Sequence, residues 1–153
     1  MARNVSGKKA SKLKPPFKCI EGHGSEAWKK LTRNGIFVIN IFYEKYNGNN
    51  RNNLSAPYEE AKPKISNRLF SAGIWETIGF GFIDIVSHGG LKREATIYRF
   101  SNRWRKISEE PGKLDKIEDL LKQIEKIKRE KSNIKKRMKI RELKKKVLEL
   151  ARR

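Results

Sequence analysis

The sequence predicts a mainly α-helical chain with one small antiparallel β-hairpin, followed by a long basic C-terminal helix. Serine or threonine residues precede several segments that have helical apolar spacing. Two segments of alternating apolar and polar residues flank a glycine pair, and from Leu114 apolar residues recur every three or four positions. All tryptophan, phenylalanine and tyrosine residues lie between Phe17 and Ile107, so we expect the core there.

Composition divides the chain into four parts. Residues 1–16 are rich in lysine, serine and glycine and lack periodicity, which predicts a disordered basic arm. Residues 17–107 form the predicted folded domain, and 108–112 a linker. Residues 113–153 are predicted to be an amphipathic, strongly basic helix.

The first half of the domain is predicted to be helical. Ser25 can cap a short helix through Leu31, and Thr32 can cap a second, largely apolar helix that ends near Tyr46. The β-branched residues of the second segment also permit a strand, but its length favours a helix. The asparagine-rich stretch YNGNNRNNLS then predicts a loop.

Two further helices and a hairpin follow. Ser55 is predicted to open the short helix SAPYEEA, and Ser66 to cap the helix SNRLFSAGIWETIG, which Gly79 or Gly81 ends. The apolar face of this last helix comprises Leu69, Phe70, Ile74 and Ile78. Alternation predicts strands at 82–87 and 95–100, joined by a turn at His88-Gly89-Gly90. Residues 53–79 have the spacing of a helix-turn-helix, and the adjacent hairpin makes the unit a winged helix.

The C-terminal region has two parts with different charge. In residues 113–127 an apolar stripe runs along a charge-balanced helix, through Leu114, Ile117, Leu121 and Ile124. This stripe is a candidate surface for self-association, although it is too short to establish a coiled coil. Residues 128–153 hold thirteen basic and three acidic side chains, a net charge of +10.

The formal charge of the whole chain is +20, which predicts a polyanionic partner, most commonly nucleic acid. Solubility alone is the alternative reason for such a charge. The single cysteine, Cys19, excludes an internal disulfide. We see neither a secretory signal nor an apolar run long enough to span a membrane, so we expect a cytoplasmic, nucleoid-associated protein.

Nothing in the sequence indicates catalysis. Cys19, His23 and His88 do not have the spacing of a metal site, and GFGFI precedes a strand, whereas a phosphate-binding loop follows one. We therefore expect no enzymatic activity, no catalytic or metal-binding residue, no cofactor and no small-molecule substrate.

Double-stranded DNA has a coherent set of candidate contacts. The second helix of a helix-turn-helix enters the major groove by its first turns, where asparagine and arginine can read adenine and guanine edges. On the helix from Ser66 these positions are Ser66, Asn67, Arg68 and Ser71, with Ala72 and Trp75 as further outward candidates. The predicted backbone contacts are Lys64, Arg103, Arg105 and the wing residues Lys92 and Arg93. Trp104 is expected to anchor the core.

The motifs AWKKL, YNGNNRNNLSAPYEEA, KISNRLFSAGI, GFIDIV and HGGLKREATIYRFSNRW, in this order, resemble the winged helix-turn-helix proteins of bacterial phages, plasmids and mobile elements. The similarity covers about residues 17–107. It implies DNA binding in a regulatory or replication-initiator-like role, with Ser66, Asn67, Arg68 and Ser71 on the recognition helix and Lys92 and Arg93 on the wing.

Two other functions stay open. The winged helix and residues 113–127 could dock a protein partner of a replication or regulatory complex, with the basic tail giving only non-specific affinity for nucleic acid. An outward Trp75 would suit such a surface. RNA binding is also compatible with the charge, although the RNP aromatics and GxxG loop of common RNA-binding modules are missing.

Overall fold

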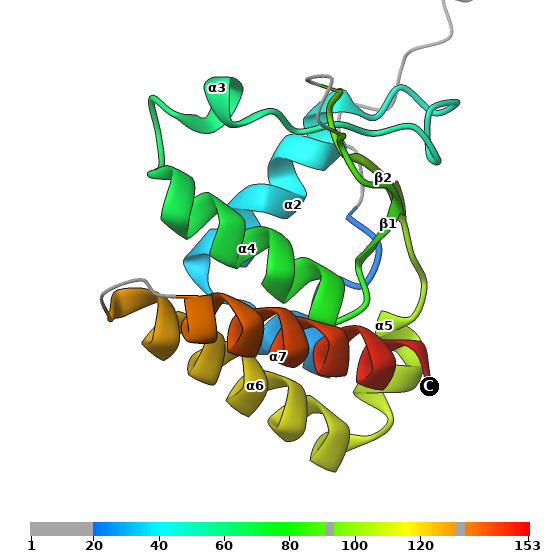
Figure 1. Ribbon diagram of the computed structural model, residues 1–153. Helices are drawn as coiled ribbons and strands as arrows, with labels where there is room; N and C mark the ends of the chain where they lie inside the picture. Colours follow the sequence, from blue (N-terminus) through cyan, green and yellow to red (C-terminus); the bar gives the residue numbers. More distant parts are fainter. Residues whose placement is uncertain (1–19, 91–93, 131–133) are drawn as a thin grey trace, which may run out of the picture.

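The computed structural model describes residues 20–90, 94–130 and 134–153. The chain is mainly helical, with one two-stranded antiparallel hairpin (Figure 1). Its elements in chain order are α1 (Glu26–Lys29), α2 (Arg33–Lys45), α3 (Tyr58–Ala61), α4 (Asn67–Gly79), β1 (Ile83–Ser87), β2 (Ile97–Phe100), α5 (Trp104–Ser108), α6 (Pro111–Arg129) and α7 (Ile134–Arg152).

Three of the four predicted helix caps are confirmed. The hydroxyls of Ser25, Thr32 and Ser66 each accept a hydrogen bond from a backbone N–H in the first turn of α1, α2 and α4. The fourth prediction was wrong, because α3 begins at Tyr58 and its N-cap is Pro57, not Ser55. The residue before a proline is driven to extended backbone, which delays the start of this helix.

Gly81 ends α4 and turns the chain into the hairpin. It has a φ of 81°, a left-handed conformation that glycine adopts without strain. In the hairpin Ile83 pairs with Phe100 and Ser87 with Ile97, with a register irregularity after Ile85. β2 begins at Ile97, two residues later than predicted, so the connection from β1 covers 88–96.

The asparagine-rich loop contributes to the sheet, which the sequence pattern did not predict. Leu54 forms an isolated antiparallel bridge with Tyr98, and the two residues exchange backbone hydrogen bonds of 3.0 and 2.8 Å. Both side chains are buried in the core cluster that α2, α4 and the hairpin share. This bridge fixes the segment before α3 to the outer edge of β2.

Helices α2 and α4 cross at close range because both carry a glycine at the contact. A Cβ at Gly73 would lie 2.7 Å from the backbone carbonyl carbon of Asn34. A Cβ at Gly35 would lie 2.7 Å from a carboxylate oxygen of Glu76. Gly73 lowers intrinsic helix propensity, but it lets the two backbones meet.

The single long C-terminal helix predicted for 113–153 was wrong. Two helices, α6 and α7, pack against each other, and α6 ends where Glu130 adopts extended backbone. Serine and asparagine, which are weak helix formers, follow at 132 and 133. In Figure 1, α7 crosses the C-terminal half of α4, and α6 runs beside α7.

The α6–α7 pair shares its core with the preceding domain. Leu114, Ile117 and Ala151 are buried in one cluster with Ala27 and Phe80. The linker expected at 108–112 shrinks to Glu109 and Glu110, since α5 ends at Ser108 and α6 begins at Pro111. The apolar stripe of 113–127 therefore packs inside the chain, and its buried residues are not available for self-association.

None of the helices in the described part of the chain is both long enough and apolar enough to cross a membrane.

Candidate nucleic-acid interface

The first turn of α4 is open to solvent. The Ser66 hydroxyl accepts a hydrogen bond of 3.4 Å from the Leu69 N–H, which orders the helix start. Asn67 and Arg68 are exposed and Ser71 is half-buried. Leu69, predicted on the apolar face, is 41 % exposed instead. The four candidate recognition residues of this helix thus lie together at an accessible helix N-terminus.

The remainder of α4 is covered. Ala72 is only 7 % exposed, and Trp75 is half-buried beneath α7, whose Lys144 ammonium lies 4.5 Å from the centre of the indole ring. A Cβ at Gly79 would lie 3.0 Å from Ile117 and 3.2 Å from Val147. Ala72 and Trp75 were further outward candidates, but Ala72 is buried and α7 packs over Trp75.

Burial beside Trp75 changes the acid–base properties of Lys144. Removal from water lowers the pKa of this ammonium to about 8, and the nearby charge of Lys128 lowers it further, against the opposing effect of Glu125. The ring face of Trp75 compensates in part, because it attracts a cation.

A cleft of about 260 Å³ lies between α4 and α6. Its walls are mainly apolar and include Leu69 and Trp75, while charged side chains line its rim. On that rim the Arg68 Nε lies 3.7 Å from a carboxylate oxygen of Glu125, and Arg129 lies on the same rim. The ion pair is long and half-exposed, so it restrains Arg68 only weakly.

Glu76 joins α4 to the start of α2, a role that the sequence did not reveal. Its carboxylate accepts hydrogen bonds from the Thr32 N–H (3.0 Å) and hydroxyl (2.8 Å). Burial raises the pKa of Glu76, and the hydrogen bonds from Thr32 partly oppose that shift. The carboxylate thus satisfies backbone donors at the N-terminus of α2 and fixes the angle at which α4 is presented.

The tip of the hairpin is described only in part. Lys92 and Arg93, the predicted wing contacts, lie outside the described residues. On either side of them the loop is exposed, and the Gly89 N–H donates a hydrogen bond of 3.1 Å to the Thr96 hydroxyl.

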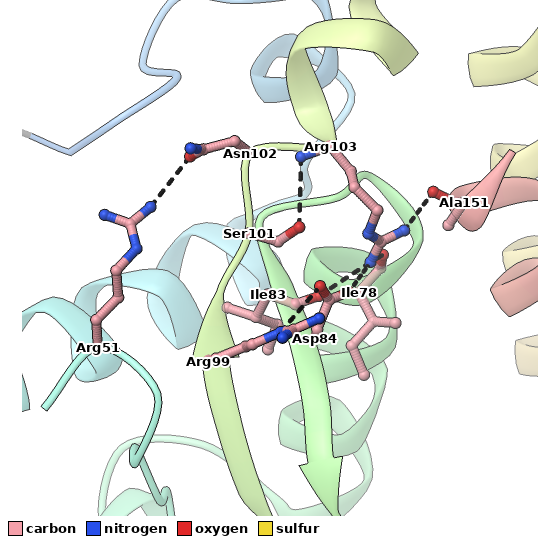
Figure 2. A network of polar contacts seen from close by, with 9 residues as sticks. All are labelled: Arg51, Ile78, Ile83, Asp84, Arg99, Ser101, Asn102, Arg103 and Ala151. Atoms are coloured by element: carbon pink, nitrogen blue, oxygen red, sulfur yellow. Dashed lines mark hydrogen bonds and ion pairs between the residues drawn. The ribbon is translucent and has the colours of Figure 1, made fainter.

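Arg103 is engaged within the fold. Figure 2 shows its guanidinium between β1 and the C-terminal ends of α4 and α7. It donates to the carbonyl oxygens of Ile78 (3.4 Å), Ile83 (3.3 Å) and Ala151, and it forms an ion pair with Asp84. We therefore omit Arg103 from the candidate interface and assign it a structural role. Its position directly after a strand, among other basic residues, gave no sign of this difference.

The other predicted contacts occupy different parts of the surface. Lys64 is exposed just before α4. Arg105 is exposed on α5, with its guanidinium 5.1 Å from the ring centre of Trp104. As expected for a core anchor, Trp104 stacks on Phe82, with ring centres 6.3 Å apart. Lys64 and Arg68 are thus close in the chain, whereas Arg105 belongs to another element.

Comparisons with known proteins give no match: no family model, curated protein or solved structure matches this chain.

The geometry therefore brings together an ordered helix start, two exposed polar side chains and several cations. Within the described residues, Lys64 and Arg129 have no acidic partner. Backbone N–H groups at a helix N-terminus favour anions, and surrounding lysine and arginine side chains add long-range attraction. Such a surface suits a phosphate backbone with base edges close by.

Proposed function

We propose that this chain is a non-enzymatic double-stranded DNA-binding protein whose α2–α4 segment and hairpin form a winged helix-turn-helix. The helix 66–79 meets the major groove, and the wing 87–95 and the basic tails contact phosphates. Its role is that of a transcriptional regulator or a replication-initiator-like protein, located with the nucleoid.

The observation that carries this proposal is the exposed first turn of α4. Asn67 and Arg68 extend from a serine-capped helix start on a chain of net charge +20. Asparagine and arginine are the side chains that bind adenine and guanine edges through two hydrogen bonds. Helix-turn-helix proteins present such residues from the first turns of their second helix.

The order of elements supports the same proposal. Helices α2, α3 and α4 are followed directly by an antiparallel hairpin, as in a winged helix. Arg103 and the Leu54–Tyr98 bridge hold that hairpin against the helices. The strands of the hairpin are thus fixed relative to α4.

The covered half of α4 limits how much sequence the protein reads. With Ala72 buried and Trp75 beneath Lys144 of α7, base contacts are confined to Asn67, Arg68 and Ser71. Few base contacts and many cations favour binding in which the backbone supplies most of the affinity. We therefore propose modest sequence preference and strong salt dependence.

The cleft between α4 and α6 favours the second candidate function, a winged-helix module that docks a protein partner. Leu69 is unusually exposed for a leucine in the first turn of a packed helix, and it lines this mainly apolar cleft. In that case the basic tail supplies only non-specific affinity for nucleic acid.

Selection from a random duplex pool with the full chain, followed by titration of one variant pair, separates the two candidates. Arg68→Ala is expected to weaken the selected site by about 1–3 kcal/mol and to leave affinity for bulk duplex nearly unchanged. Lys64→Ala, as the control, is expected to weaken both duplexes equally, because a phosphate contact carries no sequence information. Failure to enrich any sequence at physiological salt would favour the protein-docking function.

A further inference from the structure

A second cleft, larger than the one beside α4, lies between β1 and α7. It encloses about 490 Å³, and its lining includes Val86, Ser87, Arg99, Leu148 and Arg152. It therefore joins the outer surface of the hairpin to the last turns of the C-terminal helix, two regions far apart in the sequence. We refer to it as the β1–α7 cleft.

The charge of the β1–α7 cleft is positive. Its acidic residue, Asp84, is bound by Arg103 and lies 3.5 Å from the Nε of Arg99. One carboxylate thus faces two guanidinium groups. Arg99 retains 55 % of its side-chain exposure, and Arg152 is exposed without an acidic partner among the described residues. Two guanidinium groups therefore remain accessible from the cleft.

The remaining walls match the other parts of a nucleotide unit. Val86 is 52 % exposed, and with Leu148 it provides an apolar surface against which a sugar ring can pack. The Ser87 hydroxyl, also in the lining, is a neutral donor for a phosphate oxygen. Guanidinium groups bind phosphate through two parallel hydrogen bonds, a geometry that lysine cannot provide.

We infer that the β1–α7 cleft binds the phosphodiester backbone of nucleic acid, through Arg99 on β2 and Arg152 on α7. This inference rests on the proposed DNA-binding function and assigns it a second contact surface. It also gives the α6–α7 pair a role in binding beyond covering α4.

The distance between the two surfaces suits one duplex. The cleft lies near the C-terminal end of α4, whose thirteen residues rise about 1.5 Å each, or roughly 20 Å in total. One turn of B-DNA spans about 34 Å, so this separation is about half a turn. When the first turn of α4 lies in the groove of a duplex, the phosphate backbone of one strand can therefore lie at the cleft.

The test compares two double variants of the full chain, Arg99→Gln/Arg152→Gln and a control. The quantity measured is the salt dependence of their affinity for a DNA duplex. The control, Lys116→Gln/Lys126→Gln, removes the same charge from exposed residues of α6 that lie outside the basic tail and do not line the cleft. The probe is a duplex of random sequence. We expect the cleft variant to lower the log–log salt slope by about 0.9 for each phosphate that the protein no longer neutralises, and the control to leave the slope nearly unchanged.

The outcomes separate this inference from the proposed function. An equal decrease of slope in both pairs, or an unchanged slope in the cleft pair, overturns the cleft assignment and leaves DNA binding standing. Absence of duplex binding by the wild-type chain at low salt overturns both. Arg152→Glu serves as a second variant, because Arg152 makes no ion pair in the described structure. It should weaken binding more than Arg152→Gln while the far-ultraviolet circular dichroism spectrum stays the same.

Discussion

The two halves of α4 have opposite surroundings. Its first turn is exposed at Asn67 and Arg68, whereas from Ala72 onward it is enclosed by α2 on one side and by α6 and α7 on another. Here the C-terminal pair leaves only the leading end available, so α4 is a central support of the core whose exposed first turn carries the proposed base contacts.

The largest effect on the free energy of unfolding is expected where α6 covers the end of α4. Ile117→Ala removes a fully buried side chain that packs where α6 meets the end of α4. We expect it to lower the free energy of unfolding by about 3 kcal/mol, because apolar burial decreases and a cavity remains. Leu69→Ala, the control in the open half, should cost less than about 1 kcal/mol.

Urea denaturation followed by tryptophan fluorescence and by circular dichroism measures both variants. Because the α6–α7 pair shares its core with α1 and with the residues that end α4, we expect one cooperative transition by both probes. Two separate transitions, with only one shifted by Ile117→Ala, would show that residues after Glu110 fold as an independent domain.

The next largest effect concerns the crossing of α2 and α4. Gly73→Ala places a Cβ against the backbone carbonyl of Asn34, and backbone cannot move aside as a side chain would. The gain of about 1 kcal/mol in helix propensity is outweighed, and we expect a net loss of about 2 kcal/mol. Gly112→Ala in α6 is the control. It has no atom near its added Cβ, so it should be neutral or slightly stabilising. Stabilisation by Gly73→Ala would mean that the helices can separate at no cost.

Local sequence signals predicted the elements around this crossing well. Ser25, Thr32 and Ser66 marked helix starts because a hydroxyl that accepts from the first turn is a local interaction. The two strands were found because alternation is also local. The role of Gly73 could not be predicted, since it depends on which residue of another helix it meets.

The C-terminal region shows what apolar periodicity can and cannot predict. The stripe from Leu114 to Ile124 correctly indicated a buried helix face, but periodicity does not reveal what covers that face. In the candidate interface the capped start of α4 was predictable. The partial burial of Trp75 was not, because it arises from α7, a helix much later in the sequence.

A smaller effect is expected at the junction of the hairpin with both helices. Arg103→Gln leaves the carbonyl oxygen of Ala151 without its side-chain donor and deprives Asp84 of its closest cation. We expect a loss of about 1–3 kcal/mol in the free energy of unfolding, because buried polar atoms are left without partners. Arg105→Gln, with the same change on an exposed side chain, should have little effect. If thermal denaturation showed equal losses of stability for Arg103→Gln and Arg105→Gln, Arg103 would have no structural role.

The smallest effect, and the one most specific to the covered half of α4, is the contribution of Lys144 to the pH dependence of stability. Burial lowers the pKa of this ammonium from 10.5 to about 8 in the folded chain, so between these values the unfolded chain binds the extra proton. Stability should therefore rise from pH 8 to 10, and the burial cost should be fully present below pH 8.

The test is Lys144→Met, which keeps a side chain of similar length over Trp75 without the charge. At pH 7 this variant should be more stable than the wild type by about 1 kcal/mol or less, since loss of the cation–π attraction offsets part of the gain. The advantage of the variant should shrink as the pH rises toward 10, whereas Lys145→Met, at an exposed position on the same helix, should give a difference that does not change with pH. If the advantage of Lys144→Met stayed constant from pH 7 to 10, the ammonium would be hydrated, and α7 would not seal the indole of Trp75 from water.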